Sequence, residues 1–171
     1  RTLWDSVILK GPRVMTKSPK LAFLKAKWHS EIVDQALLGF KQRLEKLQVI
    51  ANVDVFDVPG AFELPLLAQN LANTVEYDAI IAAAFVVDGG IYRHDFVAQA
   101  VITGLMEVGT RTGVPVLSVS LTPHNFQSTD AHINFFKEHF VKKGAEAADA
   151  AIEILRVYDS IIKKPNARVV A

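Results

Sequence analysis

The feature that most restricts the fold is a continuous apolar run, DAIIAAAFVV, at residues 78–87. The run carries no charge after its first residue, and Asp88 follows it directly. Such a segment is typical of a strand that is buried on both faces, as the strands of parallel sheets are. Because parallel strands are joined by helical crossovers, this strand predicts an α/β domain with helices on both faces of the sheet.

Short apolar segments and helical patterns alternate on either side of this run. Further strands are predicted at 20–26, 53–58 and 116–121, and helices at 31–47, 62–71, 96–106, 129–140 and 145–162. Ser30 is the expected N-cap of the first helix, and KKG at 142–144 is expected to end the fourth and separate it from the last. We therefore predict a three-layer α/β/α sandwich around a mostly parallel four-stranded sheet.

The length of the chain fits one domain. It has 171 residues, of which 50% are hydrophobic, enough for one substantial core and too few for a second. We predict an N-terminal leader at 1–19, the folded domain at 20–164 and a C-terminal tail at 165–171. Whether the leader is flexible stays open at this stage.

Composition excludes several classes of function. The formal charge is +1 with the basic residues scattered, so no nucleic-acid partner is expected. There is no cysteine, and no apolar run approaches the roughly 20 residues of a membrane span. The first 20 residues lack the apolar core of a signal peptide, so a cytoplasmic protein is expected. The spacing of His124, His132 and His139 fits no familiar zinc motif, and we expect no metal.

Ligands of parallel sheets bind where the strands end, so the loops 27–29, 59–63, 88–94 and 118–124 are expected along one edge. Trp28 is placed there to stack on a planar heterocycle, although packing against the helix start is an equal alternative. Glu63 offers a carboxylate to ligand hydroxyls or amides, or else is an ordinary partner of the helix dipole.

The loop after the central strand has the composition of an anion site. Gly89 and Gly90 allow backbone N–H groups to line a small nest, a weakly specific signal on its own. Arg93, His94 and Asp95 follow directly, and a helix cap by Asp95 with two solvated neighbours is the plain alternative. Lys143 precedes Gly144 and is expected to interact with a helix C-terminus, with phosphate contact as the other reading.

Five segments in order extend these signals. They are AFLKAKWH at 22–29, VPGAFELP at 58–65, IIAAAFVVDGGIYRHDFV at 80–97, GVPVLSVSLTPHNF at 113–126 and VKKGAEAADAAIE at 141–153. Together they resemble the lumazine synthase family along nearly the whole chain, and most closely its decameric type II bacterial branch. The resemblance implies a flavodoxin-like sheet, with the N-terminal segment adding to a neighbouring subunit.

The resemblance also implies an activity. Members of the family condense 5-amino-6-(D-ribitylamino)uracil with 3,4-dihydroxy-2-butanone 4-phosphate, releasing phosphate and water to give 6,7-dimethyl-8-ribityllumazine, the penultimate step of riboflavin biosynthesis. They use no cofactor and no metal. They assemble as homo-oligomers, a pentamer or a dimer of pentamers, with active sites between neighbours.

Matching positions carry the family's binding roles onto this chain. The resemblance assigns the stacking aromatic to Trp28 and the phosphate turn to Gly89, Gly90 and Ile91. The remaining contacts to the ribityl chain and the pyrimidine fall on Ala61, Phe62, Glu63, Phe85, Val86, Val87 and Ser118. We expect Ser118 and the late basic residues to reach the pocket from an adjacent subunit.

Three positions depart from the family pattern. Arg93 stands where most members have a proton-transferring histidine, with His94 one place later, so either is a candidate catalytic residue. Ile91 replaces a threonine of the phosphate turn, which predicts weaker phosphate binding. The family's phosphate-binding arginine has no clear equivalent, and His132, His139 and Lys143 are the basic candidates.

Two alternatives remain beside the enzyme. One is a ring-forming flavin or lumazine binder in which Arg93 has weakened catalysis. The other is a nicotinamide-dependent oxidoreductase, which needs a glycine fingerprint after the first strand. The sequence KAKWHS at 25–30 contains no such glycines.

Overall fold

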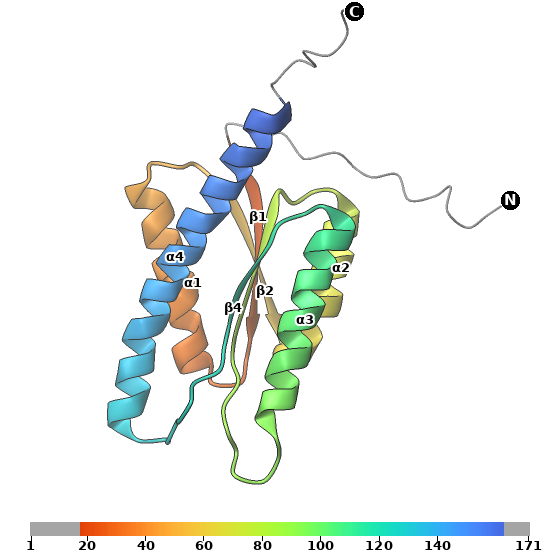
Figure 1. Cartoon of the computed structure of the whole chain (residues 1–171). Helices are drawn as coiled ribbons and strands as arrows, with labels where there is room; N and C mark the ends of the chain where they lie inside the picture. The colour runs from red at the N-terminus through yellow and green to blue at the C-terminus, as the bar shows by residue number, and fades with distance from the viewer. Residues whose placement is uncertain (1–17, 163–171) are drawn as a thin grey trace, which may run out of the picture.

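A computed structural model describes residues 18–162 as a three-layer α/β/α sandwich (Figure 1). Its central sheet has four strands in the order β2-β1-β3-β4, and every pairing is parallel. The elements follow the chain as β1 (Lys20–Ala26), α1 (Ser30–Lys46), β2 (Asn52–Val58), a 3₁₀ turn (Ala61–Glu63), α2 (Leu64–Thr74), β3 (Ala79–Phe85), α3 (His94–Thr112), β4 (Val116–Leu121) and α4 (Asp130–Ile162). The predicted fold class is confirmed, while the leader up to residue 17 and the tail from 165 lie outside the described residues.

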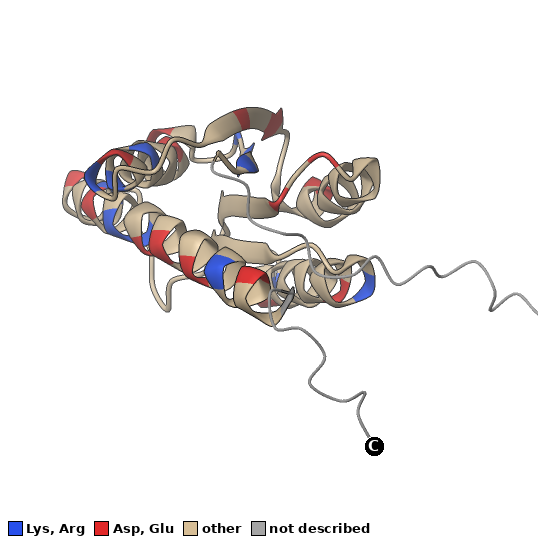
Figure 2. Ribbon diagram, turned by 90° about the horizontal axis from the view of Figure 1, so that it is seen from above, with Lys and Arg blue, Asp and Glu red and all other residues tan. Residues whose placement is uncertain are grey.

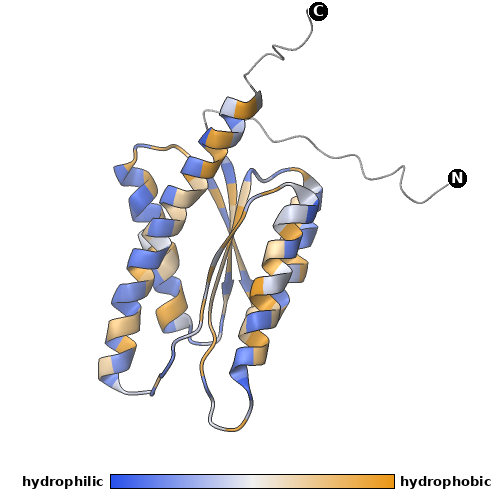
Figure 3. Cartoon of the chain, in the orientation of Figure 1, coloured by the Kyte–Doolittle hydropathy of each residue, from blue (hydrophilic) through white to orange (hydrophobic). Residues whose placement is uncertain are grey.

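The central strand explains why the apolar run is continuous. Ala79, Ile81, Ala83 and Phe85 of β3 join one buried cluster, whereas Ile80, Ala82 and Ala84 join another. The first cluster packs under α1 and α4, and the second packs under α2 and α3, on the opposite face of the sheet (Figures 1 and 3). Every residue of β3 is buried, as a strand covered on both faces requires.

Two expectations about the helices were wrong. The residues predicted as two late helices form one helix, α4, that runs through Lys142, Lys143 and Gly144. The reason is tertiary: a Cβ on Gly144 would overlap the backbone of Ala36 in α1, and one on Gly39 would overlap the backbone of Val141 in α4. The two glycines let α1 and α4 cross closely, so Gly144 serves packing and does not end a helix.

The second error concerns the start of α1. The cap position is His29, not Ser30, and His29 has left-handed backbone angles of φ 55° and ψ 39°. Smaller shifts occur elsewhere, since α3 begins at His94 and α2 is preceded by a 3₁₀ turn. Ser118 lies within β4, whose bounds are those of the strand predicted at 116–121.

Charged side chains are interspersed on the helices. Viewed from above, Lys and Arg alternate with Asp and Glu over the outer surfaces (Figure 2). Among residues 18–162, no helix combines the length and the apolarity that crossing a bilayer would need.

Candidate active site

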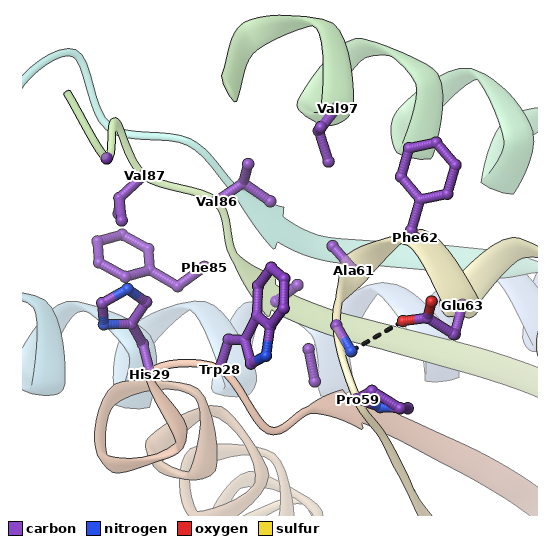
Figure 4. Close-up of a pocket in the computed structure, with 14 residues that line it drawn as sticks. Trp28, His29, Pro59, Ala61, Phe62, Glu63, Phe85, Val86, Val87 and Val97 are labelled. Atoms are coloured by element: carbon purple, nitrogen blue, oxygen red, sulfur yellow. Dashed lines mark hydrogen bonds between the residues drawn. The ribbon is translucent and has the colours of Figure 1, made fainter. Parts of the chain in front are cut away.

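A cavity of about 480 Å³ lies where β1, β2 and β3 end (Figure 4). Its volume falls in the range of small-molecule sites, and its position is the one expected for ligands of parallel sheets. Its walls come from the segments after the three strands and from the first turns of α3. The lining residues are Ala26, Trp28, His29, Pro59, Gly60, Ala61, Phe62, Glu63, Ala84, Phe85, Val86, Val87, Gly89 and Val97.

The structure gathers eight of the predicted site residues at this cavity. They are Trp28, Ala61, Phe62, Glu63, Phe85, Val86, Val87 and Gly89. The other lining residues were not among the predicted site residues: Ala26, His29, Pro59, Gly60, Ala84 and Val97. Pro59 and Gly60 stood inside a recognised turn, so the turn itself was the available signal, whereas His29 lies beside Trp28 and carried no signal of its own.

The turn that carries Trp28 is held by the chain around it. The N–H of Ser30 donates to the carbonyl of Lys27 at 3.0 Å, which closes the turn. Just before it, the Lys25 ammonium donates to carboxylates of Asp34 and Asp57, each at 2.7 Å. Partial burial opposes the charge of Lys25, but these hydrogen bonds prevail and raise its pKa. The cluster joins the end of β1 to α1 and β2, directly below the turn.

Trp28 presents its indole to the open cavity. The residue is 73% exposed, a large fraction for tryptophan. Gly60 faces it, and a Cβ built on that glycine would lie 3.6 Å from Cε3 of the indole. A planar heterocycle entering the cavity therefore meets an aromatic face that the protein leaves uncovered.

Glu63 is oriented by its own turn. Its Oε2 accepts the backbone N–H of Gly60 at 2.9 Å, drawn as the dashed line in Figure 4. This contact closes the 3₁₀ turn and fixes the carboxylate at the cavity wall. Ionised carboxylates only accept hydrogen bonds, so Glu63 suits the hydroxyl or N–H groups of a ligand.

The turn after β3 is built differently, because its groups are paired with one another. Asp88 Oδ1 accepts the N–H of Gly90 at 2.7 Å, and Gly90 has a φ of 81° that favours glycine. Gly90, Ile91, Arg93 and His94 do not line the cavity. Ile91 is 82% exposed, and the turn as a whole faces outward.

Arg93 is engaged by its own helix. Its Nε and Nη2 donate to the two oxygens of Asp95 at 3.1 and 2.8 Å, and its guanidinium lies 4.3 Å from the ring centre of Phe96. The hydrogen bonds from Arg93 lower the pKa of Asp95, and those to Asp95 raise the pKa of Arg93. Asp95 therefore pairs with Arg93 and does not cap the helix. His94 Nδ1 lies 4.0 Å from Asp88 Oδ1.

The remaining predicted residues lie elsewhere in the same chain. Ser118 and Lys143 line a separate groove of about 360 Å³ between β4 and α4, where the Lys143 ammonium donates to Glu146 at 2.6 Å. His132 accepts the N–H of Gln127 through Nδ1 at 3.0 Å, and His139 stacks on Phe135 with ring centres 6.0 Å apart. None of the four is a lining residue of the main cavity.

Fold and cavity together define a class: a flavodoxin-like α/β domain with a mostly apolar pocket at the carboxyl edge of its sheet. The model of one family, 6,7-dimethyl-8-ribityllumazine synthase, matches residues 18–159. This chain belongs to that family.

Similar proteins cover most of the chain. It is 55% identical over 141 residues to a 6,7-dimethyl-8-ribityllumazine synthase of Rhodococcus erythropolis, covering 80% of this chain and 91% of that protein. It is 48% identical over 151 residues to 6,7-dimethyl-8-ribityllumazine synthase 2 of Bradyrhizobium diazoefficiens, covering 88% and 90%. A Pseudomonas syringae protein of the same name is 49% identical over 143 residues, covering 83% and 84%.

Proposed function

We propose that this chain is a transferase of riboflavin biosynthesis that condenses 5-amino-6-(D-ribitylamino)uracil with 3,4-dihydroxy-2-butanone 4-phosphate to 6,7-dimethyl-8-ribityllumazine. The observation that supports it most is the cavity wall, where an uncovered indole, an oriented carboxylate and an apolar strand end meet. These features suit a flat ring that carries a polyol chain. A cytoplasmic location belongs to this proposal and rests on the sequence.

The pyrimidine substrate occupies the cavity. Its ring stacks on Trp28, and its ribityl hydroxyls and ring amides bind Glu63 and the backbone at Ala61 and Phe62. The segment Phe85–Val87 forms the apolar floor beneath the reacting amine. Holding two substrates in register supplies much of the acceleration, because it replaces a bimolecular encounter by an intramolecular one.

The phosphate of the second substrate lies at the turn after β3. Backbone N–H groups of Gly89, Gly90 and Ile91, in the turn that leads into α3, provide the anion nest, and Arg93 adds a permanent positive charge. In this chain the N–H of Gly90 already donates to Asp88, and the Arg93 guanidinium already donates to Asp95. Ile91 offers no hydroxyl. We therefore expect weaker binding of the butanone phosphate than a threonine-containing turn gives.

The site is completed by a second copy of the chain in a homo-oligomeric ring, a pentamer or a dimer of pentamers. Exposed apolar side chains near the cavity support an assembly, with Phe62 64%, Leu66 66% and Phe96 63% exposed. A neighbour then supplies Ser118 and the basic residues His132, His139 and Lys143. This arrangement accounts for their distance from the cavity of their own chain.

The test is turnover with both substrates at millimolar concentration, followed by lumazine fluorescence against the uncatalysed reaction. We expect saturable acceleration. The variants Arg93→Ala and His94→Ala then report which of the two supports phosphate departure, and the Arg93 variant is expected to show the larger rise in KM for the butanone phosphate. Tight binding of the ribitylated product without acceleration would support the alternative of a non-catalytic binder, which the names of the relatives do not favour.

A further inference from the structure

We propose that His29 is the catalytic proton-transfer residue of this chain. The proposal rests on the proposed function. Arg93 cannot transfer protons in this reaction, because a guanidinium stays protonated, so another residue must do so. Four observations carry the proposal: the place of His29 at the cavity, its uncommitted imidazole, its backbone conformation and its aromatic surroundings.

His29 is one of two ionisable side chains among the cavity's lining residues. The other is Glu63, whose Oε2 is committed to the N–H of Gly60. Within residues 18–162, the His29 imidazole makes no hydrogen bond and no ion pair, and it does not cap α1 although it occupies the cap position. Both of its nitrogens are therefore available to a ligand.

The backbone of His29 is unusual for its position. Three residues other than glycine have a positive φ in the described part of the chain: His29, Gln48 and Val75. Gln48 and Val75 follow the ends of α1 and α2, where the left-handed conformation is common. His29 instead begins a helix, and residues held in such conformations without a capping role cluster at functional sites.

The imidazole is oriented by aromatic contacts. Its ring lies 5.8 Å from that of Phe85 and 5.6 Å from that of Phe126, both in edge-to-face geometry. Figure 4 shows it beside Phe85 and Val87, next to Trp28 at the mouth of the cavity. The ring is thus held by apolar neighbours at the end of β3, where the reacting atoms of a heterocycle stacked on Trp28 come to lie.

Few other ionisable groups surround it. Glu63 lines the same cavity, His132 contacts Phe126 at 6.2 Å, and Lys27 and Asp88 lie in the adjoining turns with exposed side chains. His132 already accepts a backbone N–H through Nδ1. His94 lies beside Asp88, outside the set of lining residues.

The proposed step follows formation of the imine between the pyrimidine amine and the ketone of the butanone phosphate. The C–H bond next to the imine carbon breaks, and its electron pair forms a C=C bond to the carbon that carries the phosphate. The C–O bond to phosphate breaks, and phosphate leaves with the electron pair of that C–O bond, while the proton goes to His29. The enol that remains becomes a ketone as its O–H proton moves to the terminal CH2 carbon, which becomes a methyl group. The ribitylamino nitrogen then attacks this ketone, and the His29 imidazolium returns its proton to the hydroxyl that leaves as water.

The test compares His29→Asn with the unchanged protein. Asparagine tolerates the left-handed conformation and removes the titratable ring. We expect kcat to fall by roughly 100-fold or more, as for loss of a general base, while the affinity for 6,7-dimethyl-8-ribityllumazine changes less than threefold. Gln48→Asn is the matched control, because Gln48 has the same left-handed φ of 55° and does not line the cavity, and it should keep its kcat.

A second variant separates chemistry from structure. His29→Gly removes the ring and relaxes the backbone, and added imidazole should restore part of the lost rate in a saturable manner. A kcat for His29→Asn within threefold of the unchanged protein, or no rescue of His29→Gly by imidazole, would overturn the proposal. Absence of turnover by the unchanged protein would overturn the proposed function as well, so the two failures are distinguishable.

Discussion

The two sides of the candidate active site are held in opposite ways. The side that carries Trp28, Glu63 and Phe85 is supported by the sheet, by the Lys25 cluster and by the close crossing of α1 and α4. The turn after β3 projects outward, and its charged groups are paired with each other through Asp88 and Asp95. Under the proposed function, the difference predicts a preformed pocket for the heterocycle and a phosphate site that must exchange internal contacts for the substrate.

The largest expected effect on binding comes from Trp28→Ala. Removing a stacking face costs roughly 1–3 kcal/mol, so the affinity for 6,7-dimethyl-8-ribityllumazine should fall by roughly 5- to 150-fold in a fluorescence titration. Tyr92→Ala is the matched control, because Tyr92 is 85% exposed on the turn and does not line the cavity. Equal losses in the two variants would show that the heterocycle does not prefer the preformed side.

The next largest effect is on the free energy of unfolding. It compares a glycine on the supported side, Gly144, with a glycine of the outward turn, Gly89. In Gly144→Ala the added Cβ overlaps the backbone of Ala36, and overpacking of about 1–3 kcal/mol exceeds the helix propensity gained, about 1 kcal/mol. We expect a net loss of up to about 2 kcal/mol, measured by urea unfolding. Gly89→Ala, whose Cβ would meet nothing within 4 Å, should leave the unfolding midpoint unchanged.

An unchanged midpoint for Gly144→Ala would mean that α1 and α4 separate at little cost. The supported side of the site would then be less rigid than its packing indicates. Gly109→Ala offers a second control, because its Cβ would lie at least 3.5 Å from any neighbour.

The sequence was sufficient wherever a local pattern has one physical cause. Burial on both faces makes β3 readable as an uninterrupted apolar run, and parallel strands bring Trp28, Glu63 and Phe85 to one edge. Prediction from the sequence failed where the conformation of a residue depends on a contact far away along the chain. Gly144 looks like a helix end because its contact with Ala36 is 108 positions away along the chain, and the conformation and cavity position of His29 follow from packing that no local pattern records.

The smallest effect tests whether the outward turn is limited by its own carboxylates. Asp95→Asn removes the charge that holds Arg93, so KM for the butanone phosphate should fall by roughly two- to fivefold, a change of the size expected for exposed ion pairs. Because the pKa of Asp95 is lowered, the ion pair between Asp95 and Arg93 is intact at neutral pH. The pair is lost only as the pH falls through a value below the ordinary 3.8. Glu107→Gln is the control, because Glu107 pairs with Arg111 at the far end of the same helix. A KM that rises in Asp95→Asn would mean that Asp95 positions Arg93 for the phosphate and does not compete with it.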